Sequence, residues 1–304
     1  MYFEIADITV SIWLLLAWGM LVGFVFSTVG AAGGILASVG LISVFGIQDP
    51  NLVKPMAQSL TLVTPLIAVP LYIRQCRMVT SLALLLGVGG VLGAMLGSYL
   101  SLNYLSDMSV FKPVFAGLIF LIAGQIAWQL WQGRGAVSER TKSVRAAELF
   151  QIHMQGGGKS CEVGVRKVNA TRGRITIEFG EEKFSFNPLL PFLSGVAIAV
   201  MSSALGVGGG FLLVPFMTII MGLPMFIVAG TAALAVAIHS LTSISNYVRL
   251  GVDLDYPLLG LLMLGVAAGS LAGPYISKYI PEKGLRIFLM LVLLLIGLRY
   301  TGLY

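Results

Sequence analysis

Two glycine clusters are the features of this sequence best suited to binding a ligand. They read Gly30-Ala-Ala-Gly33-Gly34 and Gly206-Val-Gly208-Gly209-Gly210, and each interrupts an apolar stretch. Glycine costs about 1 kcal/mol relative to alanine inside a helix, so several together are expected to unwind it. A helix that begins after such a break presents free N–H groups and the positive end of its dipole. The sequence therefore predicts two loops that can hold an anion.

Polar side chains near these clusters are expected to add hydrogen-bond donors. The first cluster is preceded by Ser27 and Thr28, and the second by Ser202 and Ser203. Three more polar residues lie in the apolar runs that follow the clusters: Gln58, Ser59 and Thr231. We predict that all of these residues line one substrate site.

His239 is the only ionisable residue well inside an apolar run. An ionisable group within a membrane segment is a functional hypothesis by default, and imidazole titrates near neutral pH. We include His239 in the predicted site, although a neutral histidine bonded to a neighbouring helix fits the sequence equally well. Arg74 and Arg249 end their runs, where they would either draw anions to the mouth of a pathway or anchor the helix at the interface.

Close helix packing is the alternative explanation for the glycines. Pairs spaced by four residues occur within both clusters and also at Gly93/Gly97 and Gly269/Gly273. Small residues at this spacing are typical of packed membrane helices. We expect packing for the latter two pairs and binding loops for the two clusters. We do not expect a phosphate loop, because no Lys-Ser or Lys-Thr follows either cluster.

Motifs of enzymes and metal sites are missing from the chain. It has no HExxH or GxSxG motif, no Cys/His metal set and no pair of carboxylates inside an apolar run. The two cysteines, Cys76 and Cys161, are too far apart in sequence to indicate a zinc site or a disulfide framework. We therefore expect no enzyme, no cofactor and no metal. The lack of embedded acids also favours anions over cations as the cargo.

The composition indicates a membrane protein. Hydrophobic residues make up 57% of the 304 residues and charged residues 11%, whereas soluble domains carry about 25% charged residues. The mean hydropathy is +0.94. Residues 132–187 hold 10 of the 19 Lys and Arg and 6 of the 13 Asp and Glu. The net charge of +6 is then typical of cytoplasmic loops rather than of a nucleic-acid-binding protein.

Ten apolar runs divide the chain into three parts. Five runs fall in residues 1–131 and five in residues 188–304, on either side of the polar insert at 132–187. A full span needs about 20 residues, but the runs at 35–46 and 211–222 have about 12 residues each, or ~18 Å of helix. We predict an all-α polytopic membrane protein in which these two runs are half-helices.

The two outer parts resemble each other in sequence. Three pairs of segments align at an offset of 175 or 176 residues: FSTVGAAGGIL (26–36) with SSALGVGGGFL (202–212), GVLGAMLGSYL (90–100) with VAAGSLAGPYI (266–276), and Tyr72-Ile-Arg74 with Tyr247-Val-Arg249. We predict an internal repeat whose halves are inverted. The Lys and Arg of the short loops then favour a cytoplasmic insert in an inner (plasma) membrane of bacterial type.

The polar insert at 132–187 differs from the rest of the chain. Residues 136–151 are charged and would extend a helix, and residues 165–186 show the alternation of short strands, with turn residues at Asn169 and Gly173. We expect a small cytoplasmic appendage with a packing or assembly role.

At the glycine clusters the sequence resembles the sulfite exporter TauE/SafE family of membrane permeases. The resemblance rests on SSALGVGGGFLLVP (202–215), its weaker twin FSTVGAAGGILASV (26–39), the pairs Gln58-Ser59 and Gly230-Thr231, and the GxxxG patterns at 93–97 and 269–273. It covers nearly the whole chain outside 132–187. The first cluster departs from the richer pattern, with Ala31 and Ala32 where the second has Val207 and Gly208. The family implies transport of sulfur-containing anions such as sulfite and organosulfonates.

We therefore predict a permease that exports sulfite or an organosulfonate by alternating access, with a small sulfur-containing anion and the lipid bilayer as its partners. Another small anion, an uncharged solute or a metal ion is the alternative cargo. An assembly or sensor protein that is anchored in the membrane and acts through residues 132–187 is the alternative of a different class. The sequence does not indicate the oligomeric state.

Overall fold

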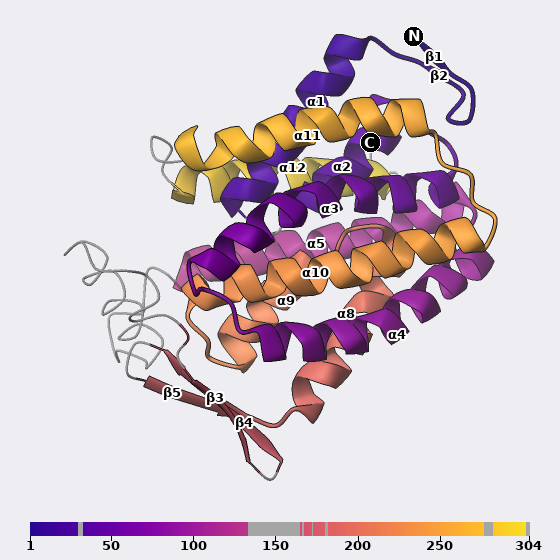
Figure 1. Cartoon of the computed structure of the whole chain (residues 1–304). Coiled ribbons are helices and arrows are strands. Elements are labelled where there is room, and N and C mark those ends of the chain that lie inside the picture. The colour runs from indigo at the N-terminus through magenta and orange to yellow at the C-terminus, as the bar shows by residue number, and fades with distance from the viewer. Residues whose placement is uncertain are drawn as a thin grey trace.

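The computed structural model describes residues 1–29, 33–132, 165, 167–171, 173–179, 182–276 and 282–301. Most of this part of the chain is helical, apart from an N-terminal hairpin and one small sheet (Figure 1). The cluster residue Gly30 and the helix extension predicted at 136–151 lie outside the described residues.

Both halves of the chain contain the same order of elements. After the hairpin strands β1 (Tyr2–Phe3) and β2 (Ile8–Thr9), the first half contains α1 (Ile12–Val29), α2 (Gly33–Val39), the π-helix η1 (Gly40–Val44), α3 (Pro50–Arg74), α4 (Thr80–Tyr104) and α5 (Met108–Gln132). The second half contains α8 (Leu189–Leu205), α9 (Gly210–Pro215), the π-helix η2 (Phe216–Ile220), α10 (Met225–Arg249), α11 (Tyr256–Ile276) and α12 (Glu282–Tyr300). Each predicted apolar run corresponds to one of these helices or helix pairs.

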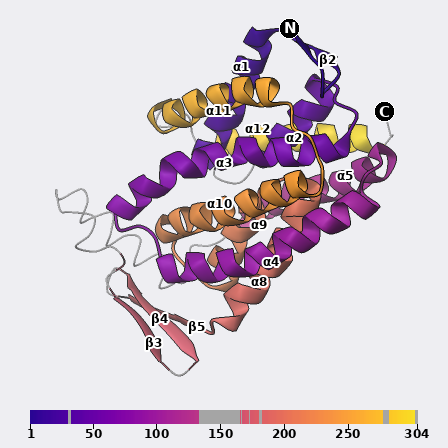
Figure 2. The same ribbon diagram turned by 45° about the vertical axis from the view of Figure 1, so that its right-hand side comes forward.

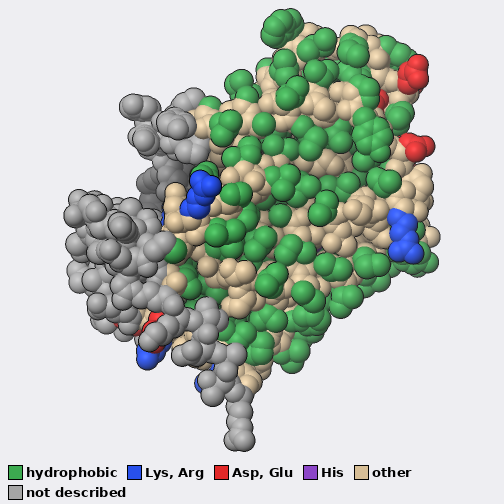
Figure 3. Space-filling model, in the orientation of Figure 1, with side chains coloured by type: hydrophobic (Ala, Val, Ile, Leu, Met, Phe, Trp, Pro, Cys, Tyr) green, Lys and Arg blue, Asp and Glu red, His purple; other side chains and the backbone are tan. Residues whose placement is uncertain are grey.

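The helices form a multi-pass membrane protein. Four helices among the described residues are long and apolar enough to cross a membrane: α3, α4, Met108–Trp128 of α5 and Ile227–Arg249 of α10. Figure 3 shows a broad face of hydrophobic side chains, with charged side chains toward the two ends of the helices. This distribution suits a bilayer, because charged groups are costly in its hydrocarbon core. The prediction of an all-α polytopic protein is therefore confirmed.

The two short apolar runs form half-helices, as predicted. α2 has seven residues and continues as η1, and α9 has six and continues as η2. About 12 residues of helix reach ~18 Å, which is less than the ~30 Å core of a bilayer. Each half-helix begins at a glycine cluster, shortly after a longer helix has ended.

Glycines bring helices of different halves into close contact. α8 lies along α4, where a Cβ on Gly89 would collide with the carbonyl of Phe192 and one on Gly97 with that of Val200. The order of these contacts shows that α4 and α8 run parallel. α1 and α11 are also parallel, because the residue numbers of their contacts rise together in both helices, from Gly19 with Leu262 to Gly23 with Val266. Gly269 of α11 also contacts Met20 of α1. The predicted packing role of the two GxxxG pairs is confirmed for Gly93, Gly97 and Gly269.

α3 and α10 form the centre of the protein and run antiparallel. Figures 1 and 2 show α11, α3, α10 and α4 side by side in that order. The start of α10 lies at the end of α3, because the Thr231 hydroxyl accepts a hydrogen bond from the Val79 N–H at 3.1 Å. α5 and α12 are also antiparallel, because Gly297 lies against Phe120 whereas Tyr300 lies against Phe115.

These chain directions define two ends of the molecule. The insert side carries the loop 75–79 and strands β3–β5, and Val165 N–H bonds the Cys76 carbonyl there at 3.1 Å. The terminal side carries the hairpin β1–β2 and the loops 105–107 and 250–255. Its hairpin is held by a hydrogen bond of 3.2 Å from Ala6 N–H to Asp255. Figure 1 shows the sheet and the N-terminal hairpin at opposite ends.

The insert contains a three-stranded antiparallel sheet, in the order β3 (Lys167–Thr171), β4 (Arg174–Phe179) and β5 (Glu182–Phe186). Phe179 and Phe184 of this sheet join a hydrophobic cluster with Val79 and Phe216 of the helical part. The predicted strands are confirmed, but the predicted turn at Asn169 is wrong because this residue pairs with Thr176. Among the described residues the turn falls at Gly173, whose φ of +82° favours glycine.

Candidate functional site

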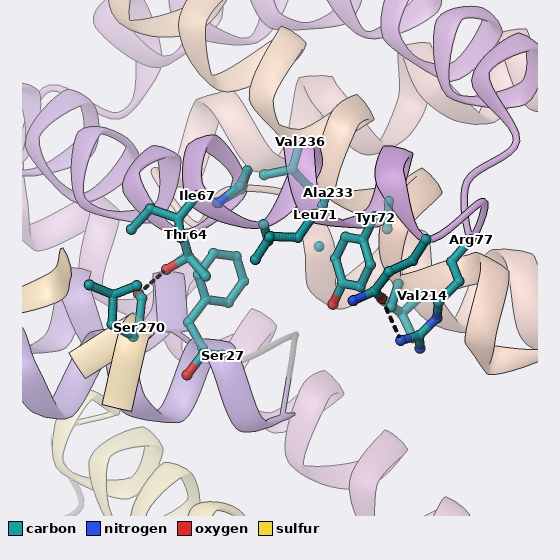
Figure 4. A pocket seen from close by; sticks show the side chains of 18 residues that line it. Ser27, Thr64, Ile67, Leu71, Tyr72, Arg77, Val214, Ala233, Val236 and Ser270 are labelled. Carbon is teal, nitrogen blue, oxygen red and sulfur yellow. Dashed lines mark hydrogen bonds between the residues drawn. The ribbon is translucent and has the colours of Figure 1, made fainter. Parts of the chain in front are cut away.

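A cavity of about 420 Å³ lies between α1, α3, α9, α10 and α11 (Figure 4). Tyr72 and Arg77 line its outer end, on the insert side. Ser27, Thr64 and Ser270 line its inner end, halfway along the central helices. The cavity therefore leads from one end of the protein toward its middle.

Three hydroxyl groups from three helices gather at the inner end. The Thr64 and Ser270 oxygens are 2.7 Å apart, and the Ser27 hydroxyl donates to the Phe24 carbonyl at 3.0 Å. One proton suffices for the hydrogen bond between two hydroxyls, so the Thr64–Ser270 pair retains a second O–H. Most of the remaining lining is apolar. An apolar cavity with a few polar groups is typical of a small-molecule site.

Arg77 supplies positive charge at the outer end of the cavity. Its guanidinium lies 5.5 Å from the Tyr72 ring centroid and donates to Gln75 at 3.2 Å. Burial lowers the pKa of Arg77, but a guanidinium stays protonated at physiological pH. Sequence reasoning placed Arg74 at such a mouth. In the structure Arg74 is exposed at the end of α3 and does not line this cavity.

The second glycine cluster forms a sharp break between α8 and α9. Three of its residues have φ in the left-handed region that glycine favours: Gly206 at +75°, Gly208 at +79° and Gly209 at +67°. Gly206 N–H bonds the Ser202 carbonyl at 2.9 Å, whereas the N–H groups of Gly208 and Gly209 have no partner among the described residues. Gly210, the next residue, lines the cavity. Two amides without a partner in the described part of the chain therefore adjoin the cavity wall.

The two glycine breaks contact each other inside the protein. A Cβ on Gly34 would collide with the carbonyl of Val207, and the Ser38 hydroxyl donates to the Gly206 carbonyl at 3.2 Å. Thr61 of α3 lies against both breaks. The prediction that two interrupted helices meet in the interior is therefore confirmed for the described residues.

Two buried polar side chains flank the second break. Gln58 of α3 donates through Nε2 to the Ser202 carbonyl at 3.1 Å, but its Oε1 has no partner among the described residues. His239 of α10 lies against Gly209, and its Nε2 also lacks a partner in this part of the chain. Their exposed fractions are 1% and 2%. Since buried polar groups are normally paired, we interpret these two atoms and the two amides as a candidate place for a polar ligand.

Other predicted site residues use their hydroxyls within the helices. The bonds are Ser59 to the Pro55 carbonyl at 2.8 Å, Thr231 to the Ile227 carbonyl at 2.6 Å and Ser203 to the Ala94 carbonyl at 2.9 Å. Gly33 packs on the side chain of Phe26, which lines the cavity. Arg249 is exposed on the terminal side, and Thr28 belongs to the last turn of α1.

The terminal side of the central helices is closed by hydrogen bonds. These run from Tyr247 to the Ser203 carbonyl at 2.9 Å, from Asn246 to Ser98 at 2.6 Å and from Lys54 to the Leu105 carbonyl at 2.6 Å. Tyr247 and Lys54 are fully buried there. The path from the insert side thus ends at the glycine breaks.

Sequence reasoning did not include the cavity residues Thr64, Tyr72, Arg77 and Ser270 in the predicted site. Two of them carried a usable signal, because Thr64 and Tyr72 align with His239 and Tyr247 at the repeat offset of 175 residues. Ser270 lay within a GxxxG pattern that predicted only packing, and Arg77 lay in a loop whose course was not predictable.

Comparison with known proteins supplies one match. The family model described as sulfite exporter TauE/SafE matches residues 15–300, which is nearly the whole chain. No curated protein and no solved structure matches the chain. Within the described residues, no group of three or more His, Cys, Asp or Glu side chains is placed to hold a metal ion.

Proposed function

Because this chain belongs to the sulfite exporter TauE/SafE family, a family of membrane permeases, we propose that it carries a small sulfur-containing anion, sulfite or an organosulfonate. The observation that carries this proposal is the cavity that ends beside the amides of Gly208 and Gly209, which have no partner among the residues that the structure describes. N–H groups held away from water favour an anion, because an ionised acceptor forms stronger hydrogen bonds with them than a neutral one does.

Several groups would guide the anion to this place. Arg77 lies at the outer end of the cavity, and the hydroxyls of Thr64 and Ser270 lie at its inner end. Val236 lines the cavity on α10, and His239 lies one turn further along that helix. The anion would pass from water to the hydroxyls and then to the amides, and would exchange one set of donors for another at each step.

Transport requires that the two sides open in turn. The cavity reaches the breaks from the insert side, while Tyr247 and its neighbours close the terminal side. Antiparallel α3 and α10 occupy equivalent places in the two aligned halves, which supports an inverted repeat. In an inverted repeat, an exchange of the two halves' conformations produces the opposite state, open to the terminal side.

We propose that the insert side faces the cytoplasm, as the loop Lys and Arg indicate. Expelling an anion is then favoured by the membrane potential, by ~2.3 kcal/mol for each charge per 100 mV. One feature favours the opposite orientation, in which the insert side lies outside the cytoplasm. Cys76 on this side is disulfide-bonded, which its spacing did not predict, and disulfides persist in oxidising compartments. The sidedness is therefore a separate question from the cargo.

Flux into proteoliposomes tests the cargo. Purified protein would be given inward gradients of sulfite, methanesulfonate, chloride and an uncharged solute such as urea. We expect movement of the sulfur anions alone, and unrelated anions should compete poorly. Equal movement of chloride or urea, or no movement of any sulfur anion, would contradict the proposal.

A further inference from the structure

Gln58 points to the kind of sulfur anion that this protein prefers, an inference that rests on the proposed function. Its Nε2 faces two carbonyl oxygens, those of Ser202 at 3.1 Å and Ser203 at 3.5 Å. Only the NH₂ end of the amide can face two acceptors, so the orientation of the group is determined by its neighbours. Oε1 therefore faces the other way as an acceptor.

This acceptor has no donor among the described residues, although the side chain is 1% exposed. A buried oxygen without a donor is unfavourable, so the site is complete only when a donor arrives. The nearby loop between α8 and α9 has donors that need an acceptor. The amides of Gly208 and Gly209 are donors without acceptors, and the Ser202 carbonyl ties this loop to Gln58.

An occupant that satisfies both needs must present acceptors to the loop and a donor to Gln58. A fully deprotonated oxyanion presents acceptors only, so it would leave Oε1 unpaired and set a lone pair against another lone pair. An oxyanion that also has an O–H or N–H group completes both sides. Hydrogensulfite, a hydroxyalkanesulfonate and an aminoalkanesulfonate all have this chemistry.

We propose that the site selects sulfur oxyanions that carry at least one hydrogen-bond donor, and that Gln58 is the residue that recognises the donor. We expect the anion to reach Gln58 from the cavity, whose wall includes Thr64 of the same helix. Thr61 lies between them, against both glycine breaks. In this conformation the site around Gln58 is closed off from the cavity, whose inner end is lined by the Thr64–Ser270 hydroxyl pair.

Paired substrates in proteoliposomes test this selectivity. 2-Hydroxyethanesulfonate and propane-1-sulfonate have the same charge and differ by a hydroxyl in place of a methyl group; hydrogensulfite and methanesulfonate form a second pair. In the wild type we expect the donor-bearing member of at least one pair to move about 10-fold faster, because its rival leaves a buried acceptor unpaired. Gln58→Met should reduce this ratio to about one, as its acceptor is gone.

The control is Gln48→Met, which removes an exposed glutamine on the terminal side and should keep the wild-type ratio. Equal rates for both members of both pairs in the wild type would overturn the selectivity, and a water molecule would then be the partner of Oε1. Loss of the fold in Gln58→Met leaves the wild-type comparison as the deciding measurement. Failure of every sulfur anion to move would instead contradict the proposed function.

Discussion

Tyr72 and Tyr247 occupy equivalent positions in the two halves, but their surroundings differ. Tyr247 is fully buried and donates to the Ser203 carbonyl at 2.9 Å. Tyr72 is half-buried in the cavity wall, and its hydroxyl has no hydrogen-bond partner in the described part of the chain. Ser27, which aligns with Ser203, lines the same cavity. The hydrogen bond from Tyr247 to Ser203 thus closes the terminal side, whereas the equivalent bond from Tyr72 to Ser27 is not formed on the insert side.

Two segments of similar sequence therefore adopt two different conformations in the same structure. The same residue types recur at the same offset, yet one tyrosine seals its helix end and the other borders an opening. A transporter needs this asymmetry, because a protein open to both sides would leak. We expect Tyr72 to bond the Ser27 carbonyl when the insert side closes.

The largest expected effect falls at the boundary between the open and closed parts. Gly209→Leu places a side chain against His239 at a residue with φ of +67°. We expect loss of sulfite flux in proteoliposomes, because the side chain would block the step between cavity and loop. Gly117→Leu is the matched control, since nothing lies within 4 Å of a Cβ at that exposed position. Normal flux in correctly folded Gly209→Leu would show that the loop is not on the path.

Thiol labelling tests the open and closed sides directly. Ala68 lines the cavity, and its equivalent Ser243 is 1% exposed. A membrane-impermeant maleimide should label Ala68→Cys quickly and Ser243→Cys slowly, with the unsubstituted protein as the background. Similar labelling of both positions would contradict the asymmetry. Labelling of Ala68→Cys in inverted but not right-side-out vesicles would place the insert side in the cytoplasm, and the reverse would place it outside.

Removal of the tyrosine hydroxyls should affect the two halves unequally. Tyr247→Phe loses a buried hydrogen bond, so we expect the free energy of unfolding to fall by about 1 kcal/mol. Tyr72→Phe should leave it nearly unchanged, because that hydroxyl has no partner in the described structure. Thermal melting of the two purified variants in the same detergent measures the difference. A loss of equal size in both would mean that Tyr72 is also bonded.

The smallest expected effect is at the mouth of the cavity. Arg77→Met removes the cation at the outer end and should raise the substrate concentration for half-maximal flux by roughly three- to tenfold at low salt. The gap between variant and wild type should narrow as salt rises, because ions screen the attraction. Arg74→Met should have a weaker effect, since Arg74 does not line the cavity. A stronger effect of Arg74→Met would indicate that the pathway opens at Arg74 rather than at Arg77.

Much of the fold was predictable from sequence. Long apolar runs predicted the helices to within a few residues, because lipid-facing segments need a continuous apolar surface and internal backbone hydrogen bonds. Two runs were too short to span, and glycines preceded both, so the half-helices were also predictable. The course of the loop 75–79 was not, and with it Arg77 was missed.

The candidate site was predictable only in part. Gly208, Gly209, Gln58 and His239 were found because glycines and polar groups are conspicuous in apolar sequence. Ser59 and Thr231 looked equivalent to Gln58, but their hydroxyls bond carbonyls of their own helices. Which way a polar side chain faces depends on its neighbours in space.

Composition, run length and glycine spacing alone determined that this is a membrane protein with two broken helices, because the bilayer imposes those patterns locally along the chain. Only the tertiary structure decided that the cavity opens on the insert side and that Tyr247 is sealed while Tyr72 is not. That choice depends on how α3 and α10 pack against the outer helices, and repeated sequences do not distinguish the two arrangements.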